Sequence, residues 1–230
     1  MKTESAKQRE LNRRRFLVVS GAAAFALIMH RSVARALGAQ PEENLGGAAH
    51  RPDEAAAGRI LIAYATKCGS TATVAEAIKQ VLVGTGASVD LRLAKSVKDL
   101  SPYRAVIVGS PIYMGKWMSE AAAFVRKNQD LLGRLPTAFF VVCLTMKDDT
   151  KENRETTLAY LNPVRKGAPG VKPVAVGLFP GVADFSKLSF LYKTMLKAAG
   201  GTEGDYRNFP AVKRWAGDLG PALAATPVRG

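Results

Sequence analysis

A short run of hydroxyl residues around one glycine is the part of this sequence best suited to chemistry. It reads Thr66-Lys67-Cys68-Gly69-Ser70-Thr71, directly after an apolar run and directly before an amphipathic helical pattern. The first N–H groups of a helix are free, and its aligned peptide dipoles favour an anion there. Gly69 lets the backbone approach a ligand, and the hydroxyls add neutral donors. The run predicts a phosphate-binding loop, and the alternative is an ordinary turn with Ser70 or Thr71 as the helix N-cap.

Other motifs for phosphate binding or nucleophilic catalysis fit the sequence poorly. No G-x-x-x-x-G-K-[ST] is present, which argues against a nucleotide-hydrolysing P-loop. Gly84 and Gly86 follow a helical pattern and lack a third glycine, so we interpret them as a turn. A phosphatase loop built on Cys68 would need an arginine near the helix start, where the chain has Val74. Both histidines precede residue 51, which argues against Ser-His or Cys-His catalysis and the usual zinc sites in the domain that follows.

A second stretch with chemical potential follows the third predicted strand. Residues 109–117 read Gly-Ser-Pro-Ile-Tyr-Met-Gly-Lys-Trp. Two aromatic side chains and two glycines suit a flat conjugated ring, which needs a stacking surface and backbone donors at its edge. The alternative is that Tyr113 and Trp117 only pack against a helix N-terminus while the glycines make turns. We favour the ring-binding interpretation because this loop and the first one follow strands of the same predicted sheet.

The elements that must position these loops alternate regularly. Five apolar runs of strand length, separated by helical patterns, cover residues 59–65, 87–93, 105–109, 138–144 and 174–179. Continuous apolar runs between helices indicate strands covered on both faces, hence a parallel sheet. The helical patterns predict buried faces made by Val74, Ile78, Val81 and Leu82 in the first helix and by Val212, Trp215 and Leu219 in the last. In such an α/β sheet, ligands bind outside the carboxyl ends of the strands, where the strand order reverses.

The first 58 residues are expected to lie outside the folded domain. The pair Arg13-Arg14 precedes a mild apolar stretch and then Ala34-Arg35-Ala36, an order that resembles a twin-arginine export signal. The apolar part, residues 16–29, is shorter than the about 20 residues needed to cross a bilayer. We therefore expect a signal peptide or anchor over residues 1–36 and a linker over 37–58. The protein would be periplasmic or membrane-associated, or lie at the cytoplasmic membrane face if the leader does not function.

The charge balance favours an anionic partner. The chain carries a formal net charge of +14, and residues 37–230 hold 25 basic against 17 acidic residues. Such an excess suits a carboxylate substrate or a membrane surface. Nucleic acid is not supported, because there is no zinc-ligand spacing, helix-turn-helix signal or aromatic RNA-binding motif.

Three segments together carry a resemblance to a known family. Thr66 to Thr71, Gly109 to Gly115 and the tail Gly200-Gly201-Thr202-Glu203-Gly204-Asp205-Tyr206 resemble the flavodoxin superfamily, more narrowly its quinone-dependent protoporphyrinogen IX dehydrogenase branch. The resemblance covers roughly residues 59–219. It implies a domain over residues 59–225, with an α/β flavodoxin-like fold: a five-stranded parallel sheet of order 2-1-3-4-5, helices on both faces, and non-covalent FMN.

The resemblance also implies the FMN site and the reaction. The phosphate would rest on Thr66, Lys67, Cys68, Gly69, Ser70 and Thr71, and the ring on Pro111, Ile112, Tyr113, Met114 and Gly115, with Thr145 to Asp149 closing the other side. A tetrapyrrole or another anionic apolar substrate would be oxidised, and electrons would pass to a quinone or a redox protein. Alternatives are an electron-transfer flavoprotein without a small-molecule substrate and a flavin-free interaction domain. No catalytic residue is assigned, although Lys147, Asp148, Asp149 and Tyr113 are candidates for proton transfer.

Two further expectations concern the cysteines and a long segment before the last helix. In the implied strand order Cys68 and Cys143 lie two strand spacings apart, about 9.5 Å, which is too far for a disulfide. Residues 184–197 place Phe185, Leu188, Tyr192, Met195 and Leu196 on one helical face with lysines at its edges. This segment is either a core helix with a basic rim or a basic amphipathic surface for a membrane or an apolar anionic substrate.

Overall fold

The computed structural model describes residues 58–198 and 200–224. The leader predicted over residues 1–36, and the linker predicted over 37–58 apart from its last residue, lie outside this range. Within the described range, no helix is long and apolar enough to cross a membrane.

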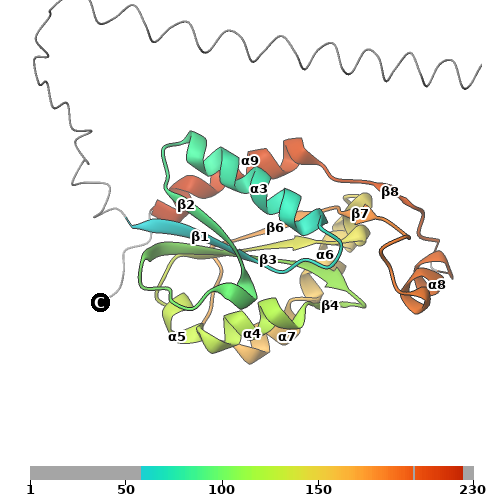
Figure 1. The fold of residues 1–230 in the computed structure, drawn as a ribbon, viewed down its shortest axis with the longest axis horizontal. Helices are drawn as coiled ribbons and strands as arrows, with labels where there is room; N and C mark the ends of the chain where they lie inside the picture. Colours follow the sequence, from blue (N-terminus) through green and yellow to red (C-terminus); the bar gives the residue numbers. More distant parts are fainter. Residues whose placement is uncertain (1–57, 199, 225–230) are drawn as a thin grey trace, which may run out of the picture. The chain divides into compact units, whose positions relative to one another are not determined.

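Five parallel strands form the centre of the fold (Figure 1). They are β1 (Arg59–Tyr64), β2 (Val89–Leu93), β3 (Tyr103–Tyr113), β5 (Thr137–Val142) and β6 (Ala175–Phe179). Their spatial order is β2-β1-β3-β5-β6, which confirms the predicted order 2-1-3-4-5 for the five long strands. Every residue of β5 is buried, as expected for a strand covered on both faces.

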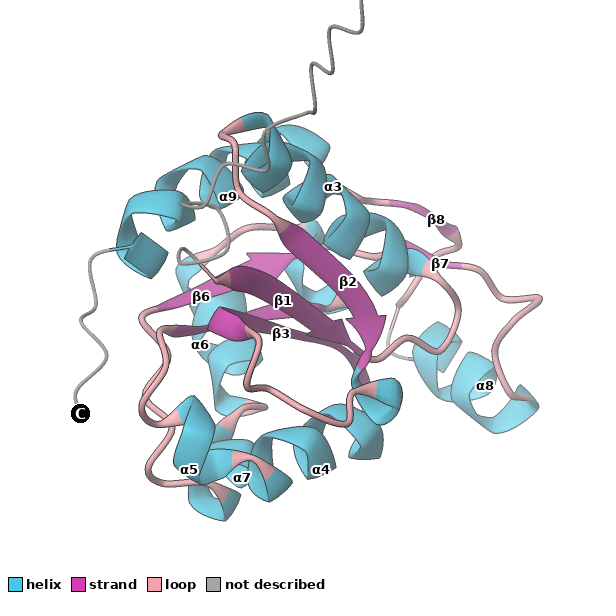
Figure 2. Cartoon of the chain, turned by 60° about the vertical axis from the view of Figure 1, so that its left-hand side comes forward, coloured by secondary structure: helices cyan, strands magenta, loops and turns pink. Residues whose placement is uncertain are grey.

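Helices cover both faces of this sheet (Figures 1 and 2). One face carries α3 (Ser70–Gly84) and α9 (Phe209–Ala224), and the other carries α4 (Ser119–Lys127), α5 (Gln129–Leu132) and α7 (Asn162–Gly167). The remaining helices near the sheet are α6 (Lys151–Ala159) and two 3₁₀ turns, η1 (Ala94–Ser96) and η2 (Leu144–Lys147).

The strand residues divide between two hydrophobic clusters because successive side chains point to opposite faces. Ile60, Ile62 and Phe140 pack with α3 and α9, whereas Leu61 and Phe139 belong to the opposite cluster. The predicted helix faces are largely confirmed, since Val74, Ile78, Leu82, Val212 and Leu219 are all buried. Val81 and Trp215 are only half-buried, and the Trp215 ring meets the Phe179 ring edge-on at 5.6 Å between centroids.

The third strand is longer than predicted, and this corrects the loop expected over residues 109–117. β3 continues to Tyr113 and folds back as a hairpin onto β4 (Lys116–Trp117). The two turn residues, Met114 and Gly115, both have positive φ, 51° and 72°, as tight hairpin turns require. The buried Ser110 hydroxyl donates to the Pro111 carbonyl and accepts from the Met118 N–H, which holds the base of the hairpin.

After β6 the chain leaves the sheet and returns through a narrow neck. β7 (Val182–Ala183) pairs antiparallel with β8 (Gly204–Asp205), and the Tyr206 N–H donates to the Gly181 carbonyl at 3.1 Å. We call the enclosed residues, 184–203, the excursion. It carries α8 (Phe190–Ala198), which lies apart from the two helix layers in both views (Figures 1 and 2).

The core-helix interpretation of this segment is wrong, because α8 has no buried residue. The helix also begins at Phe190 and not at Asp184. Residues before it form a turn in which the Asp184 carboxylate accepts from the Ser186 N–H and hydroxyl. A short acidic side chain that bonds backbone two residues on favours a turn over helix, and the sequence pattern alone did not reveal this.

Candidate functional site

The predicted phosphate-binding loop joins β1 to α3. Gly69 occupies the N-cap position with φ 93°, and its N–H donates to Thr66 Oγ1 at 3.0 Å. The alternative that Ser70 or Thr71 caps the helix is therefore wrong, because the helix begins at Ser70 and its cap residue has no side chain. No acidic residue lies in the first turn, so nothing there opposes an anion.

Two details of this loop fit a phosphate group. Thr71 is fully buried, and its hydroxyl has no hydrogen-bond partner among the described residues. A buried unpaired donor costs about 1–3 kcal/mol, so such groups usually have a ligand or water as partner. Beside Gly69, a Cβ would meet no heavy atom within 4 Å, which leaves open space on that side of the loop. The loop thus offers free donors, room and no negative charge.

Two cavities meet at the carboxyl ends of the strands. The smaller, about 50 Å³, lies beside the loop, and the larger, about 390 Å³, lies between the hairpin and the segment after β5. Ile112, Leu144 and Tyr192 line both cavities. Tyr192 comes from α8, so the excursion supplies one of the three side chains that lie between the two cavities.

The structure brings most of the predicted cofactor residues to these cavities. The smaller is lined by Lys67, Cys68, Ser70, Pro111, Ile112 and Tyr113, and the larger by Ile112, Gly115 and Thr145. Met114 instead lines a separate surface groove with Lys67 and Tyr113. Thr66, Gly69 and Thr71 line none of these cavities and shape the loop itself, as described above. Contact between these residues and a cofactor remains a prediction.

The excursion contributes site residues that the sequence analysis did not find. The Tyr192 ring lies 4.5 Å from the Tyr113 ring between centroids, at an interplanar angle of 51°. The Tyr113 hydroxyl lies 3.3 Å from Ser189 Oγ, and Lys67 Nζ lies 5.7 Å from the centre of the Tyr113 ring. Burial, above all, raises the pKa of Tyr192, so this phenol stays neutral. Only the unusual length of chain before the last helix signalled this arrangement.

The proton-transfer candidates separate by position. Lys147 and Asp148 line the larger cavity, and Tyr113 lines the smaller one. Lys147 Nζ lies 4.8 Å from the ring centre of Tyr206, which is another wall residue of the larger cavity. Asp149 is held in an ion pair by Arg154 and lines neither space. Among the described residues, Lys147 is therefore the cationic side chain that lines the larger cavity.

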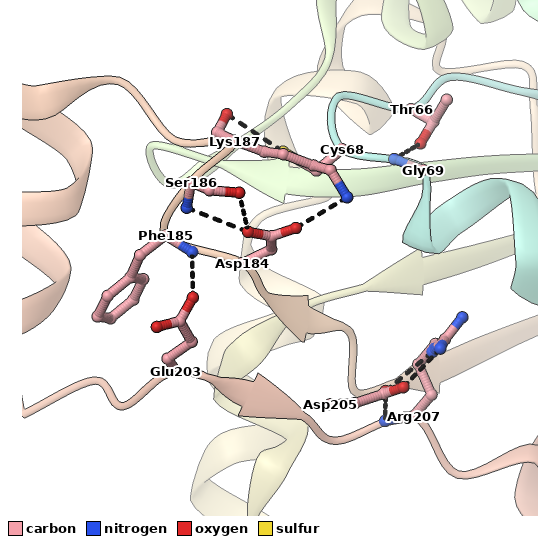
Figure 3. A network of polar contacts seen from close by, with 10 residues as sticks. All are labelled: Thr66, Cys68, Gly69, Asp184, Phe185, Ser186, Lys187, Glu203, Asp205 and Arg207. Carbon is pink, nitrogen blue, oxygen red and sulfur yellow. Dashed lines mark hydrogen bonds and ion pairs between the residues drawn. The ribbon is translucent and has the colours of Figure 1, made fainter. Parts of the chain in front are cut away.

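A polar network fastens the excursion to the loop (Figure 3). Cys68 Sγ donates to the Lys187 carbonyl at 3.7 Å, and Lys187 Nζ pairs with Asp184 at 2.8 Å. The hydrogen bond from Lys187, followed by that from Ser186, lowers the pKa of Asp184 to about 2. At the other end, Glu203 accepts from the Phe185 N–H at 3.1 Å. The glutamate of the tail noted in the sequence thus closes the excursion.

A family model described as a flavodoxin domain matches residues 61–208, which include the loop, the hairpin and the excursion. The chain belongs to the flavodoxin domain family. Among curated relatives, the protoporphyrinogen IX dehydrogenase [quinone] of Leishmania major is 27% identical over 186 residues, which cover 74% of this chain and 78% of the relative. The protein of that name from Escherichia coli K12 is 23% identical over 163 residues, 68% of this chain and 88% of the relative.

Solved structures give a weaker likeness to this flavodoxin domain. Oxidised flavodoxin 2 from Bacillus cereus is 20% identical and covers 72% of this chain and 97% of its own, with a TM-score of 0.41. Membership of the family supports FMN as the cofactor, and the donor-rich, uncharged first turn of α3 fits its phosphate.

The environment of Cys68 leads to a prediction about its reactivity. Burial, and next the negative charge of Asp184, raise the pKa of the thiol. In a Cys143→Ala background, Cys68 is the remaining cysteine of the chain, so alkylation by iodoacetamide at pH 8 reports its thiolate fraction. Asp184→Asn removes a charge that opposes the thiolate and frees the Lys187 ammonium. We expect alkylation to become about threefold faster or more.

Asp149→Asn serves as the control for this measurement, because Asp149 pairs with Arg154 and does not contribute to the pKa of Cys68. An alkylation rate that Asp184→Asn leaves unchanged would contradict the electrostatic account of this thiol.

Proposed function

We propose that this flavodoxin domain is an FMN-dependent oxidoreductase that oxidises protoporphyrinogen IX and passes the electrons to a quinone. The observation that carries the proposal is the wall that the excursion adds to the larger cavity, because a protein that only exchanges electrons with other proteins needs no such wall beside its cofactor. The excursion builds one wall of it with Tyr192, Leu196 and Thr202, and Tyr206, directly after β8, extends this wall. Two curated relatives that match most of this chain carry the corresponding name.

The wall residues suit a large apolar molecule with carboxylates. Tyr160, Tyr192 and Tyr206 give flat surface for a tetrapyrrole, and Lys147 gives a cation for a carboxylate. Bound FMN would supply the electron-accepting chemistry, and the protein supplies position and electrostatics. The tilted contact between the Tyr192 and Tyr113 rings holds Tyr192 at the boundary between the cavities. Lys147, in this proposal, binds and orients the substrate.

The direct test is anaerobic oxidation of protoporphyrinogen IX by the FMN-loaded chain with a water-soluble quinone. We expect protoporphyrin fluorescence to rise at a rate that depends on the quinone. Lys147→Gln should raise KM about tenfold with little change in kcat, because a charge-assisted contact to a carboxylate is worth about 1.5–3 kcal/mol. Lys151→Gln, at the start of α6 and outside the cavity walls, is the matched control.

The alternative, an electron-transfer flavoprotein without a small-molecule substrate, predicts a different outcome. The FMN-loaded chain would then show no turnover with protoporphyrinogen IX at any quinone concentration, yet would exchange electrons rapidly with reduced redox proteins. That combination would rule out the enzyme proposal.

A further inference from the structure

The outer face of α8 is the most exposed apolar surface of the described residues. Phe190, Leu191 and Met195 are 85%, 62% and 50% exposed. In a helix, residues i, i+1, i+4 and i+5 lie on one side. Counted from Phe190, these are Leu191, Thr194 and Met195, so the three apolar side chains share one face with Thr194. Tyr192 and Leu196 occupy the opposite side and line the larger cavity. The helix therefore has an inner face toward the site and an apolar outer face without a partner in the described structure.

Between its two acidic end residues, every charged side chain of the excursion is basic. Between residues 186 and 202 the sequence contains Lys187, Lys193 and Lys197 and no Asp or Glu. Lys193 and Lys197 make no ion pair within the described part of the chain, and their Nζ atoms lie 5.8 and 5.5 Å from the Phe185 ring centre. The acidic residues at the two ends are already engaged, Asp184 by Lys187 and Glu203 by the Phe185 N–H. An approaching surface thus meets large apolar side chains beside uncompensated ammonium groups.

We propose that the outer face of α8 docks onto an anionic phospholipid bilayer, with Phe190, Leu191 and Met195 inserted among the acyl chains and Lys193 and Lys197 at the headgroups. An exposed helix with apolar side chains on one face and lysines beside them binds at a lipid interface through buried apolar area plus attraction to anionic headgroups. The neck formed by β7 and β8 leads to α8, which lies apart from the helix layers of the domain (Figures 1 and 2).

Charge complementarity favours lipid over the other occupants of such a face. A second copy of this chain would bring the same lysines against Lys193 and Lys197, and like charges in contact oppose association. An anionic bilayer suits both the apolar side chains and the lysines, since it offers an apolar interior beneath a negative surface. Docking in this way would place the larger cavity directly behind α8, near the lipid into which an apolar quinone partitions.

The test is sedimentation of the full chain with vesicles of equal parts phosphatidylglycerol and phosphatidylethanolamine. We expect a Phe190→Ser, Leu191→Ser, Met195→Ser triple variant to bind at least about a hundredfold more weakly, because each buried large apolar side chain contributes strongly to transfer. Lys193→Gln with Lys197→Gln should lower binding about tenfold at low salt, and less at high salt. Binding to neutral phosphatidylcholine vesicles should be much weaker for the unaltered chain.

Every variant keeps the N-terminal 57 residues, so a difference in vesicle binding between variants reports the effect of α8. Val83→Ser, Leu131→Ser and Val174→Ser together remove three exposed apolar side chains elsewhere and should leave binding unchanged. Bound flavin and circular dichroism confirm that each variant is folded. Equal vesicle binding by the α8 triple variant and this control would overturn the proposal, as would self-association that the triple variant abolishes without any vesicle binding. The assay requires no turnover, so its outcome is separate from that of the proposed reaction.

Discussion

Gly69→Val is expected to remove FMN from the protein while the fold survives. The cause is backbone strain and not a steric clash. Gly69 has φ 93°, whereas a Cβ at this position would meet no heavy atom within 4 Å. A β-branched residue at such an angle is strained, so the loop must rearrange and its N–H groups lose their common direction. Charge-assisted hydrogen bonds are worth about 1.5–3 kcal/mol each, and the loss of two lowers FMN affinity about a hundredfold or more. Titration of FMN with the protein, followed by flavin fluorescence, measures this affinity.

Gly86→Val is the matched control for this substitution. Gly86 also has a positive φ, 88°, and open space around its Cβ position, but it lies in the turn after α3, away from the loop. Both variants should lose comparable stability, of the order of 1–3 kcal/mol. Only Gly69→Val should lose FMN. Stoichiometric FMN in the folded Gly69→Val variant would contradict the assignment of this loop to the phosphate.

Gly109→Ala is expected to cause the largest loss of stability of any single methyl addition we consider. A Cβ at this position would lie 1.9–2.5 Å from three ring atoms of Phe140, its partner on β5. Phe140 is fully buried between the sheet and the α3–α9 layer, so its ring has no free space to enter. Overpacking of this kind costs about 3 kcal/mol, measured as a lower midpoint in urea denaturation.

A second substitution shows whether the ring is the cause. Phe140→Leu shortens the side chain, so the double variant with Gly109→Ala should be more stable than the two single effects predict, by about 1–2 kcal/mol. Gly217→Ala on the exposed side of α9, where a Cβ meets nothing, should instead stabilise by about 0.5–1 kcal/mol. If the effects of Gly109→Ala and Phe140→Leu simply add, the clash is relieved by movement of residues other than Phe140.

The sheet and the phosphate-binding loop were predictable because their signals are local. Continuous apolar runs such as the one ending in Val142 occur where strands are covered on both faces, and a single glycine between a strand and a helix indicates the turn. Gly109 shows where this reasoning ends. Its sequence context indicated the start of a loop, but Gly109 lies within β3. There the Phe140 ring occupies the space that a Cβ at position 109 would need. That requirement is a tertiary contact across strands.

The excursion was the least predictable part of the site. The single apolar face predicted for it was wrong. Phe185 and Leu188 precede the helix, and Met195 lies on the exposed face, whereas Tyr192 and Leu196 line the larger cavity. The position of α8 depends on the neck and on the bond between Glu203 and the Phe185 N–H, which join residues about 20 positions apart in the sequence. Cys68 and Cys143 are both free, in agreement with the separation expected from the strand order.

The two-strand neck makes the excursion a separable module. Because β7 and β8 bring its ends side by side, the chain enters and leaves at nearly the same place, and the five-stranded sheet does not depend on what lies between them. Closure entropy grows slowly with loop length, so segments of quite different size can occupy this position at similar cost. One flavin-binding scaffold can therefore acquire new surroundings for its cofactor by exchange of this segment alone, and the neck is the natural junction for grafting such segments between relatives.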